Sequence, residues 1–413
     1  MNDFDIAWVR AQFPALNLME SGKPLVFFDN PGGTQVTQGV ISAITDYYQT
    51  SNANIGGAFA TSRRTDAVLH TARSAMATLL NADAEELVFG PNMTTLTFHL
   101  ARSIGETIRP GDEIVLTNLD HDGNVTPWLD LAAQGAVIKF VDFDPADCTL
   151  DPAQFQAVLS DRTRLVAITH ASNAVGTIPN VAAVTEMAHA VGAWVFVDAV
   201  QFAPHGIIDV RALDCDFLAC SAYKFFGPHA GILFGKATHL RQLTPHKLRP
   251  AKDTLPHRWE TGTQNHECMA GITAAVAHLQ EIGQHSGAAA GSPRSALESG
   301  LKAIHAYEQS LTTHLLQGLS QLPDLKIYGL TDLDRLDERV PTVAFTWPRL
   351  TPRATAEYLG EHGICCWSGN YYALRLMERL GLEEHGGAVR IGLAHYNTRE
   401  EIDRLLNLLN DCK

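Results

Sequence analysis

The fold is decided by residues 163–200, TRLVAITHASNAVGTIPNVAAVTEMAHAVGAWVFVDAV. The runs 163–172 and 193–200 are short and almost wholly apolar, which is typical of strands buried on both faces of a parallel sheet. Between them, residues 180–192 place apolar side chains at helical spacing and end at a glycine. The stretch therefore predicts a strand, a helix and a second parallel strand.

The same alternation extends on both sides of this unit. Residues 151–160 are predicted to form a helix with Asp151 as its cap and Pro152 in the first turn. Further strands are expected at 85–90, 111–120, 135–144 and 215–224. Alternation of this kind indicates a largely parallel sheet covered by helices, with ligands binding at the carboxyl ends of its strands.

The pattern changes after residue 235. Residues 245–264 hold three prolines and few apolar runs, which indicates a long loop. The sequence then predicts a helix at 267–283, a loop of small residues at 286–295 and a long amphipathic helix from about Ala296. After these it predicts a strand at 339–347, a helix at 351–363 and a strand within 388–398. The last helix begins at a capping box of Thr398 and Glu401. The expected fold class is α/β, with a large domain built on a mainly parallel sheet and a smaller α+β C-terminal domain. The expected division is an N-terminal segment at 1–28 that packs with the small domain, the large domain at 29–275 and the small domain at 276–413.

Composition narrows the class of partner. The net charge of -14 disfavours nucleic acid and anionic membranes, and no apolar run approaches the length of a membrane helix. The N-terminus lacks the pattern of a secretory signal. Seven cysteines without a CxxC pair indicate reduced thiols and a cytoplasmic location, and 18 histidines without an HExxH motif predict no metal site.

Two charged residues follow neighbouring predicted strands. Asp198 ends one apolar run, and Lys224 follows the next, 26 residues later. Taken singly, such an aspartate is usually a cap and such a lysine is usually solvated. Together, a buried carboxylate and a lysine of lowered pKa are what pyridoxal phosphate requires, since the lysine forms a Schiff base and the carboxylate keeps the ring nitrogen protonated.

Other polar residues complete the same ligand. Gln201 and Asn173 are within reach of the phenolic oxygen of the ring, and His121, after another strand, is placed to stack on the ring face. Ser221 and the backbone of residues 92–97, at the start of a helix, are suited to bind phosphate.

These residues carry a family resemblance. Residues 170–205 followed by 214–235, with Asp-x-x-Gln at 198–201 and Ser-x-x-Lys at 221–224, resemble the fold-type I, class V aminotransferase superfamily that depends on pyridoxal 5'-phosphate. The likeness is strongest to its cysteine desulfurase and selenocysteine lyase branch, and it runs from residue 26 to residue 398.

The resemblance implies a role for each matching position. Lys224 would form the internal aldimine and then move protons at Cα, Asp198 would pair with the pyridine nitrogen, and His121 would act in catalysis and stack on the ring. Gln201 and Asn173 would contact the phenolic oxygen. The residues implied at the phosphate are Met93, Thr94, Thr95, Ser221 and Tyr223, where Tyr223 replaces a histidine that relatives often have. The family is dimeric, so a homodimer is implied, with Thr263 reaching the cofactor phosphate of the neighbouring subunit.

The resemblance also implies an α-amino acid substrate. Arg390 would hold the substrate carboxylate through its planar guanidinium, with Asn173 beside it. Residues 29–34 and 370–377 are expected to line the substrate pocket. Desulfurases of this branch carry a cysteine on a loop before that arginine, and here the position holds Tyr372, while Trp367 stands where relatives often have arginine.

The missing cysteine leaves the reaction open. Cys365 and Cys366 lie six or seven residues upstream of Tyr372 and are interpreted as core residues, with Cys366 as the alternative sulfur acceptor if the loop is displaced. The leading hypothesis is a desulfurase-like lyase that forms an external aldimine and a quinonoid and then expels a group from Cβ without a persulfide. The alternatives are a class V aminotransferase or epimerase, and a weakly active sulfur-assembly scaffold that binds pyridoxal phosphate.

Overall fold

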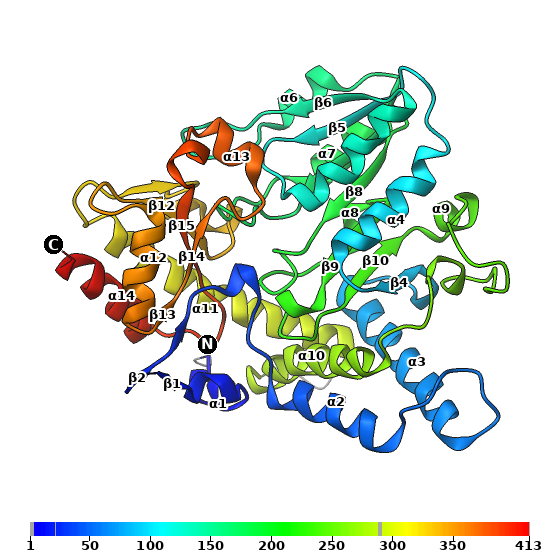
Figure 1. Cartoon of the computed structure of the whole chain (residues 1–413), viewed down its shortest axis with the longest axis horizontal. Helices are drawn as coiled ribbons and strands as arrows, with labels where there is room; N and C mark the ends of the chain where they lie inside the picture. The colour runs from blue at the N-terminus through cyan, green and yellow to red at the C-terminus, as the bar shows by residue number, and fades with distance from the viewer. Residues whose placement is uncertain (1–3, 21, 288–290, 413) are drawn as a thin grey trace.

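A seven-stranded sheet forms the centre of the computed structural model, which describes residues 4–20, 22–287 and 291–412 (Figure 1). Five neighbouring strands run parallel, and β10 runs antiparallel to β9 and to β4 at one edge. In spatial order the strands are β4 (Leu87–Gly90), β10 (Gly231–Gly235), β9 (Phe217–Ser221), β8 (Trp194–Asp198), β7 (Thr163–Thr169), β5 (Glu113–Thr117) and β6 (Val137–Val141). The prediction of a mainly parallel sheet is confirmed.

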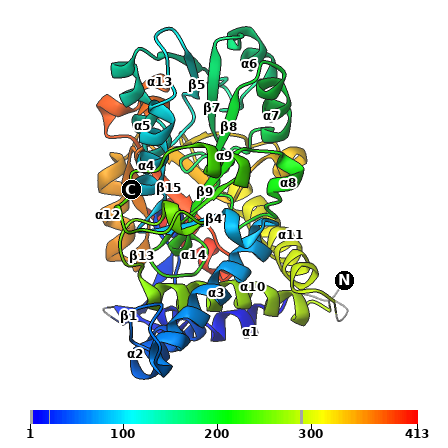
Figure 2. The same ribbon diagram turned by 90° about the vertical axis from the view of Figure 1, so that its right-hand side faces the viewer.

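Helices cover both faces of this sheet (Figure 2). Val195 and Val197 of β8 belong to the core shared with α7 (Val181–Ala190) and α10 (His266–His285), whereas Phe196 belongs to the core shared with α4 (Met93–Gly105). Because both faces are buried, β8 has no polar alternation, as its sequence predicted. The other helices of this part are α3 (Ala60–Leu80), α5 (Thr126–Leu129), α6 (Pro152–Val158), α8 (Val210–Leu213), α9 (Ala237–Gln242) and α2 (Gln38–Thr50), which packs on α10.

A second, antiparallel sheet lies in the C-terminal part of the chain. Its order is β11 (Lys326–Tyr328), β12 (Thr342–Thr346), β15 (Ala388–Gly392) and β14 (Trp367–Gly369). The helices of this part are α11 (Pro293–Leu319), α12 (Pro352–Glu361), α13 (Leu374–Arg379) and α14 (Arg399–Asp411). The predicted smaller α+β unit is therefore confirmed.

The N-terminal segment contacts this second unit. Its helix is α1 (Ile6–Ala11), and its strands are β1 (Met19–Glu20), β2 (Lys23–Pro24) and β3 (Val26–Phe27). β3 pairs in parallel with β13 (Ile364–Cys365), and Arg10 Nη1 lies 2.8 Å from Glu401 Oε1. The boundaries at residues 28 and 275 stay predictions.

Local signals fixed most helix ends. The cap at Asp151 and the capping box of Thr398 and Glu401 are both formed. The long helix α11 begins at Pro293 rather than near Ala296, because the Ser292 side chain accepts from the backbone N–H of Ser295 and starts the helix earlier. Of the small-residue loop predicted at 286–295, positions 288–290 lie outside the described residues.

The helices α10 and α11 cross at two glycines. A Cβ added at Gly283 would overlap the carbonyl oxygen of Ala296, and one added at Gly300 would overlap that of Leu279. The close approach of the two backbones therefore depends on the absence of side chains at these positions.

None of the helices in the described residues is both long and apolar enough to span a membrane.

Candidate active site

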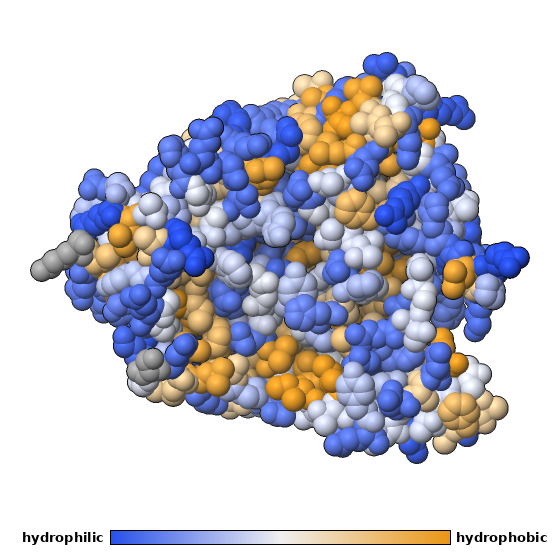
Figure 3. Space-filling model, viewed as in Figure 1, coloured by the Kyte–Doolittle hydropathy of each residue, from blue (hydrophilic) through white to orange (hydrophobic). Residues whose placement is uncertain are grey.

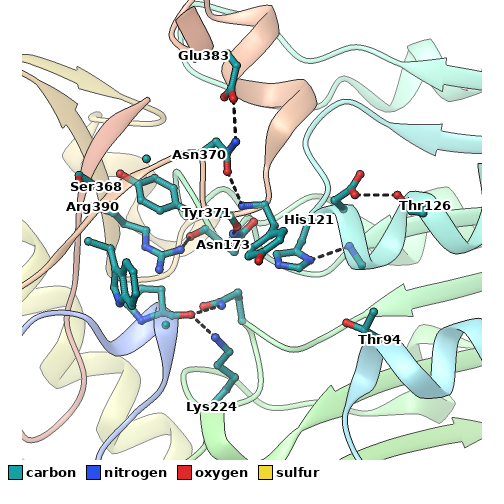
Figure 4. A pocket seen from close by; sticks show the side chains of 18 of the residues that line it. Thr94, His121, Thr126, Asn173, Lys224, Ser368, Asn370, Tyr371, Glu383 and Arg390 are labelled. Atoms are coloured by element: carbon teal, nitrogen blue, oxygen red, sulfur yellow. Dashed lines mark hydrogen bonds between the residues drawn. The ribbon is translucent and has the colours of Figure 1, made fainter. Parts of the chain in front are cut away.

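Two adjoining cavities open at the carboxyl ends of β5, β7, β8 and β9. The inner cavity, of about 350 Å³, is bounded by Met93, Asp198, Ser221 and His229. The outer cavity, of about 820 Å³, extends to the second unit and is lined by residues that include Gly32, Trp367, Tyr372 and Arg390 (Figure 4). Both spaces share Thr94, His121, Asn173, Gln201, Tyr223 and Lys224. This is the place where ligands bind in parallel α/β sheets.

Lys224 lies at the centre of the site. β9 ends at Ser221, three residues earlier than expected, and a 3-10 turn (Ala222–Lys224) carries the lysine into the inner cavity. Its side chain donates to the carbonyl oxygen of Pro31 and lies over the Tyr223 ring, 4.7 Å from the centroid. Burial and the nearby Arg390 lower the pKa of Lys224 to about 7. An amine of this kind is uncharged in a large fraction of molecules at neutral pH.

Asp198 lies at the end of β8 and lines the same cavity. Only 4% of it is exposed, and its Oδ1 accepts from the backbone N–H of Val200 at 2.9 Å. Burial raises the pKa of Asp198 to about 6, although the positive charge of Lys224 opposes the rise. The sequence prediction that Asp198 and Lys224 share one crevice agrees with this geometry, because β8 and β9 are neighbours with Asp198 opposite Ala219.

The N-terminus of α4 bounds the other end of the inner cavity. Met93 and Thr94 line the cavity, and the backbone N–H of Met93 donates to Ser221 Oγ at 3.0 Å. Thr95 is exposed and lines neither cavity, and its backbone N–H donates to the capping side chain of Asn92 at 2.9 Å. The structure therefore does not bring Thr95 to the site, while the helix end still directs positive potential at the cavity.

The two predicted amides line both cavities together with Lys224. Gln201 Nε2 donates to the Pro31 carbonyl at 2.8 Å, and Asn173 Nδ2 donates to the Tyr371 carbonyl at 2.8 Å. Asn173 Oδ1 is buried without a hydrogen-bond partner, so it is free to accept from a ligand in the cavity.

His121 follows β5 and lines both cavities. Its Nδ1 accepts from the backbone N–H of Gly123 at 2.9 Å, which leaves the ring proton on Nε2. Burial and the positive charge of Lys224 lower the pKa of His121 to about 4, so the ring is neutral at pH 7. A neutral, planar ring at this place is suited to stack on an aromatic ligand.

Arg390 projects from β15 into the outer cavity. Its Nη1 donates to the Asn173 carbonyl at 2.8 Å, its guanidinium lies 4.3 Å from the centroid of the Tyr371 ring, and its Nε is buried without a partner. Burial lowers the pKa of Arg390 to about 10. A buried guanidinium with a free N–H is a binding site for a carboxylate.

The segment 370–372 bridges the two units across the outer cavity. The Tyr371 carbonyl accepts from Asn173, the Tyr372 carbonyl accepts from the backbone N–H of Asp122 at 2.6 Å, and Asn370 Nδ2 donates to Glu383 Oε1 at 3.0 Å. The backbone of Tyr371 and Tyr372 is left-handed, with φ of 55° and 59°. The side chain of Tyr372 is 72% exposed, and its ring centroid lies 5.6 Å from that of His121.

The adjacent residues Cys365 and Cys366 do not line either active-site cavity. Cys365 and Cys366 line a separate pocket of about 330 Å³ that also contains Asp29. Trp367 and Ser368 line both this pocket and the outer cavity, whereas Cys365 and Cys366 line only this pocket. Burial raises the pKa of Cys365 to about 11 and that of Cys366 to about 12, which keeps both thiols protonated at neutral pH.

One predicted site residue lies outside both cavities, and three residues that line the outer cavity were not predicted. Thr263 is exposed before α10 and lines neither cavity of its own chain, so its predicted contact with a neighbouring subunit stays a prediction. Sequence reasoning missed Phe98, Thr126 and Glu383, which line the outer cavity. The only signal was their nearness along the chain to the start of α4, to His121 and to the loop at 370–377. In the described residues, no group of three or more histidine, cysteine or acidic side chains is arranged to hold a metal ion.

The chain matches one protein family along most of its length. The sequence model of the family described as aminotransferase class-V matches residues 26–405. The chain belongs to the class V aminotransferase family. It is 36% identical to the aminotransferase-like protein FGM3 of Gibberella zeae, over 98% of each chain. It is also 36% identical to a cysteine desulfurase of Synechococcus elongatus, over 97% of this chain and 63% of that protein.

The structure matches the family as well. The fold superposes on the apo structure of a cysteine desulfurase from Thermococcus onnurineus with a TM-score of 0.88, at 27% identity over 98% of this chain and 97% of that one. The protein is thus a cysteine desulfurase-like enzyme of class V, a family that uses pyridoxal phosphate. The expected family and fold type are confirmed.

The residues present suit that cofactor. The inner cavity of about 350 Å³ is large enough for a small cofactor, and it offers a buried carboxylate, a buried amine and a helix N-terminus. Asn173 Oδ1, buried and unpartnered, supplies a further polar contact.

Proposed function

We propose that this protein binds pyridoxal 5'-phosphate in the inner cavity and acts on an L-amino acid as a desulfurase-like lyase that needs no persulfide cysteine. Lys224 would hold the cofactor covalently and Asp198 would pair with its ring nitrogen. The supporting contacts would come from Met93, Thr94, His121, Asn173, Gln201, Ser221 and Tyr223. When bound, the cofactor supplies an acceptor for the electrons released at the substrate Cα.

Proton transfer at the substrate is assigned to Lys224. Its pKa of about 7 means that Nζ exists in both the neutral and the protonated form near pH 7. Nζ is therefore suited to take a proton from Cα and to return one later. The carbonyl of Pro31, which accepts from Nζ, fixes the direction in which the amine points.

Substrate orientation is assigned to Arg390 and Asn173. Arg390 lines the outer cavity and Asn173 lines both cavities, and Nη1 of Arg390 donates to the backbone carbonyl of Asn173. They would hold the α-carboxylate so that Cα lies next to Lys224. The ring of His121 would cover the ligand from one face and exclude water.

The observation that carries the choice of lyase is the position of the thiols. By the family resemblance, Tyr372 stands where relatives carry the sulfur-accepting cysteine, and its side chain lines the outer cavity. Cys366 lines the neighbouring pocket and not the outer cavity, and burial raises its pKa to about 12. A protonated thiol in another pocket is poorly placed to accept sulfur from a substrate at Lys224. A group expelled from Cβ would then leave directly to solvent through the outer cavity.

The assembly is proposed to be a homodimer in a reducing compartment. Ile41, Tyr48, Ile55 and Phe59 are exposed large hydrophobic side chains on α2 and before α3. Figure 3 shows hydrophobic residues along the lower edge of this face, where Figure 1 places α2 and α10. Such a surface favours burial against another copy, which would bring Thr263 toward its partner's site. All seven cysteines are free, which supports the cytoplasm.

A panel of L-amino acids given to the purified enzyme tests the reaction. Sulfide together with pyruvate from L-cysteine supports the lyase, and the double variant Cys365→Ser, Cys366→Ser should release both at the wild-type rate. Alanine with protein-bound sulfur, lost in that variant while the fold is intact, would contradict the proposal. A new amino acid that appears only with an added 2-oxo acid would instead indicate an aminotransferase.

A further inference from the structure

A further cavity is lined in part by residues that follow the strands of the active site. This back cavity, of about 330 Å³, is lined by residues of four segments: His170 and Ile178, Phe202–Ile207, the face of α11 from Leu301 to Thr312, and Leu336–Pro341. It shares no lining residue with the inner or the outer cavity. Its size is that of a site for a small organic molecule.

The back cavity contains a buried carboxylate that is only half satisfied. Glu308, in the middle of α11, is 2% exposed, and its Oε2 lies 2.8 Å from His205 Nδ1. Its other oxygen, Oε1, is buried without a hydrogen-bond partner. An unpaired carboxylate oxygen in the interior is costly, so this position favours a ligand that brings a hydrogen-bond donor.

An aromatic wall stands beside this carboxylate. The rings of His170 and Phe202 are stacked with centroids 3.7 Å apart, and Phe202 also lies against Gly206, where an added Cβ would overlap its ring. His170 Nδ1 is a second buried atom without a partner. Ile207, Leu336 and other apolar side chains share the lining with the polar ones, so the cavity also offers a surface to the apolar body of a ligand.

Several of the polar groups that line the cavity already have partners. The buried Arg339 donates to the backbone carbonyls of Leu330, Thr342, Val175 and Val340, so its hydrogen bonds are directed into the protein. At the rim, His305 and Gln309 both contact Asp337. Lys302 is an exposed cation at this rim. Glu308 Oε1 remains as a buried carboxylate oxygen without a partner, and such an oxygen favours a ligand with a positively charged N–H donor.

We propose that the back cavity is a binding site for a small organic ammonium compound with an apolar or aromatic body. The N–H of the ammonium group would donate to Glu308 Oε1, and the apolar body would lie against Phe202 and Leu336. The proposal is independent of the reaction at Lys224. An occupant would contact the segments that continue into Asp198 and Gln201, since the backbone N–H of His170 donates to the Asp198 carbonyl at 2.7 Å.

Calorimetric titration of the full-length holoenzyme with N,N-dimethylbenzylamine tests this site. This tertiary amine carries one N–H when protonated, and it cannot condense with an aldehyde at Lys224. The wild type should bind it at millimolar concentration or below, and phenylacetate should not bind. Glu308→Gln should weaken binding by about tenfold or more, the loss expected for a hydrogen bond to a charged group.

Two further variants protect the test against misfolding. Asp337→Asn removes a negative charge of the same kind at the exposed rim and should leave binding within about twofold of the wild type. Leu336→Trp fills the cavity without altering Glu308 and should abolish binding. The proposal is overturned if the wild type shows no binding, if Asp337→Asn weakens binding as much as Glu308→Gln, or if a crystal soaked in the amine shows only water at Glu308.

Discussion

Replacing Arg390 by methionine should separate substrate binding from folding. The guanidinium has a buried, unpartnered Nε, and a substrate carboxylate would accept two charge-assisted hydrogen bonds from it. Each such bond contributes about 1.5–3 kcal/mol, so about 3–6 kcal/mol is lost from the bound state. Since about 1.4 kcal/mol is a factor of ten, kcat/KM should fall by about 10²- to 10⁴-fold.

The stability of the Arg390→Met variant should not fall with its activity. Burial lowers the pKa of Arg390 to about 10, which means that the folded protein disfavours this charge. Replacing a buried, incompletely paired cation by an apolar side chain is often neutral or stabilising. The melting temperature of the Arg390→Met variant, measured without substrate, should therefore equal or exceed that of the wild type.

The assay is steady-state turnover of the best substrate from the amino-acid panel, together with thermal unfolding. Arg375→Met is the matched control, because Arg375 also lies over an aromatic ring, at 3.5 Å from the Phe140 centroid, but lines neither active-site cavity. This control should keep kcat/KM within about threefold. A fall of less than tenfold in Arg390→Met, or an equal fall in the control, would refute the assignment of the carboxylate site.

Three further predictions concern the buried charges and the helix crossing. In cofactor-free protein, Lys224→Met should raise the free energy of unfolding by up to about 4 kcal/mol at pH 7. The reason is that the lysine binds a proton readily in the unfolded chain, whereas its burial in the folded protein disfavours the proton. Chemical denaturation at several pH values should show this gain in stability shrinking toward pH 10. Asp198→Asn should lower kcat by about 10²-fold or more while the protein remains folded, and an unchanged kcat would contradict its role at the ring nitrogen. Gly300→Ala, at the crossing of α10 and α11, should destabilise the protein by about 1–3 kcal/mol. The control Gly360→Ala, where nothing lies within 4 Å of the added Cβ, should be neutral or stabilising by about 0.5–1 kcal/mol. Equal melting temperatures of the two variants would show that the crossing tolerates a side chain.

The sequence predicted those parts of the site that lie at strand ends. Asp198 and Lys224 follow adjacent parallel strands, and the end of a strand is defined by where its apolar run stops, so their shared cavity followed from pattern alone. Arg390 and Tyr372 were placed by resemblance to a family. Arg390 lies within β15, and Tyr372 lies in the loop between β14 and β15, which has no periodic signal of its own.

Long-range contacts set the limit of sequence reasoning. The Pro31 carbonyl accepts from Lys224 across 193 positions, and a backbone oxygen leaves no mark in the sequence. The family resemblance implied Thr95 at the phosphate, but its backbone N–H donates to the cap at Asn92 and it lines neither cavity. The back cavity joins four separate segments, so Glu308 in the sequence appeared only as one more charge on an amphipathic helix.

The central claim is that Lys224 holds the cofactor covalently. Reduction of the holoenzyme with borohydride, followed by proteolysis and mass spectrometry, locates the lysine whose Nζ is joined to pyridoxal phosphate. The account predicts a single modified peptide containing Lys224, and no modification in Lys224→Ala. A modified peptide with a different lysine, or unmodified Lys224 in protein that carries the cofactor, would contradict it.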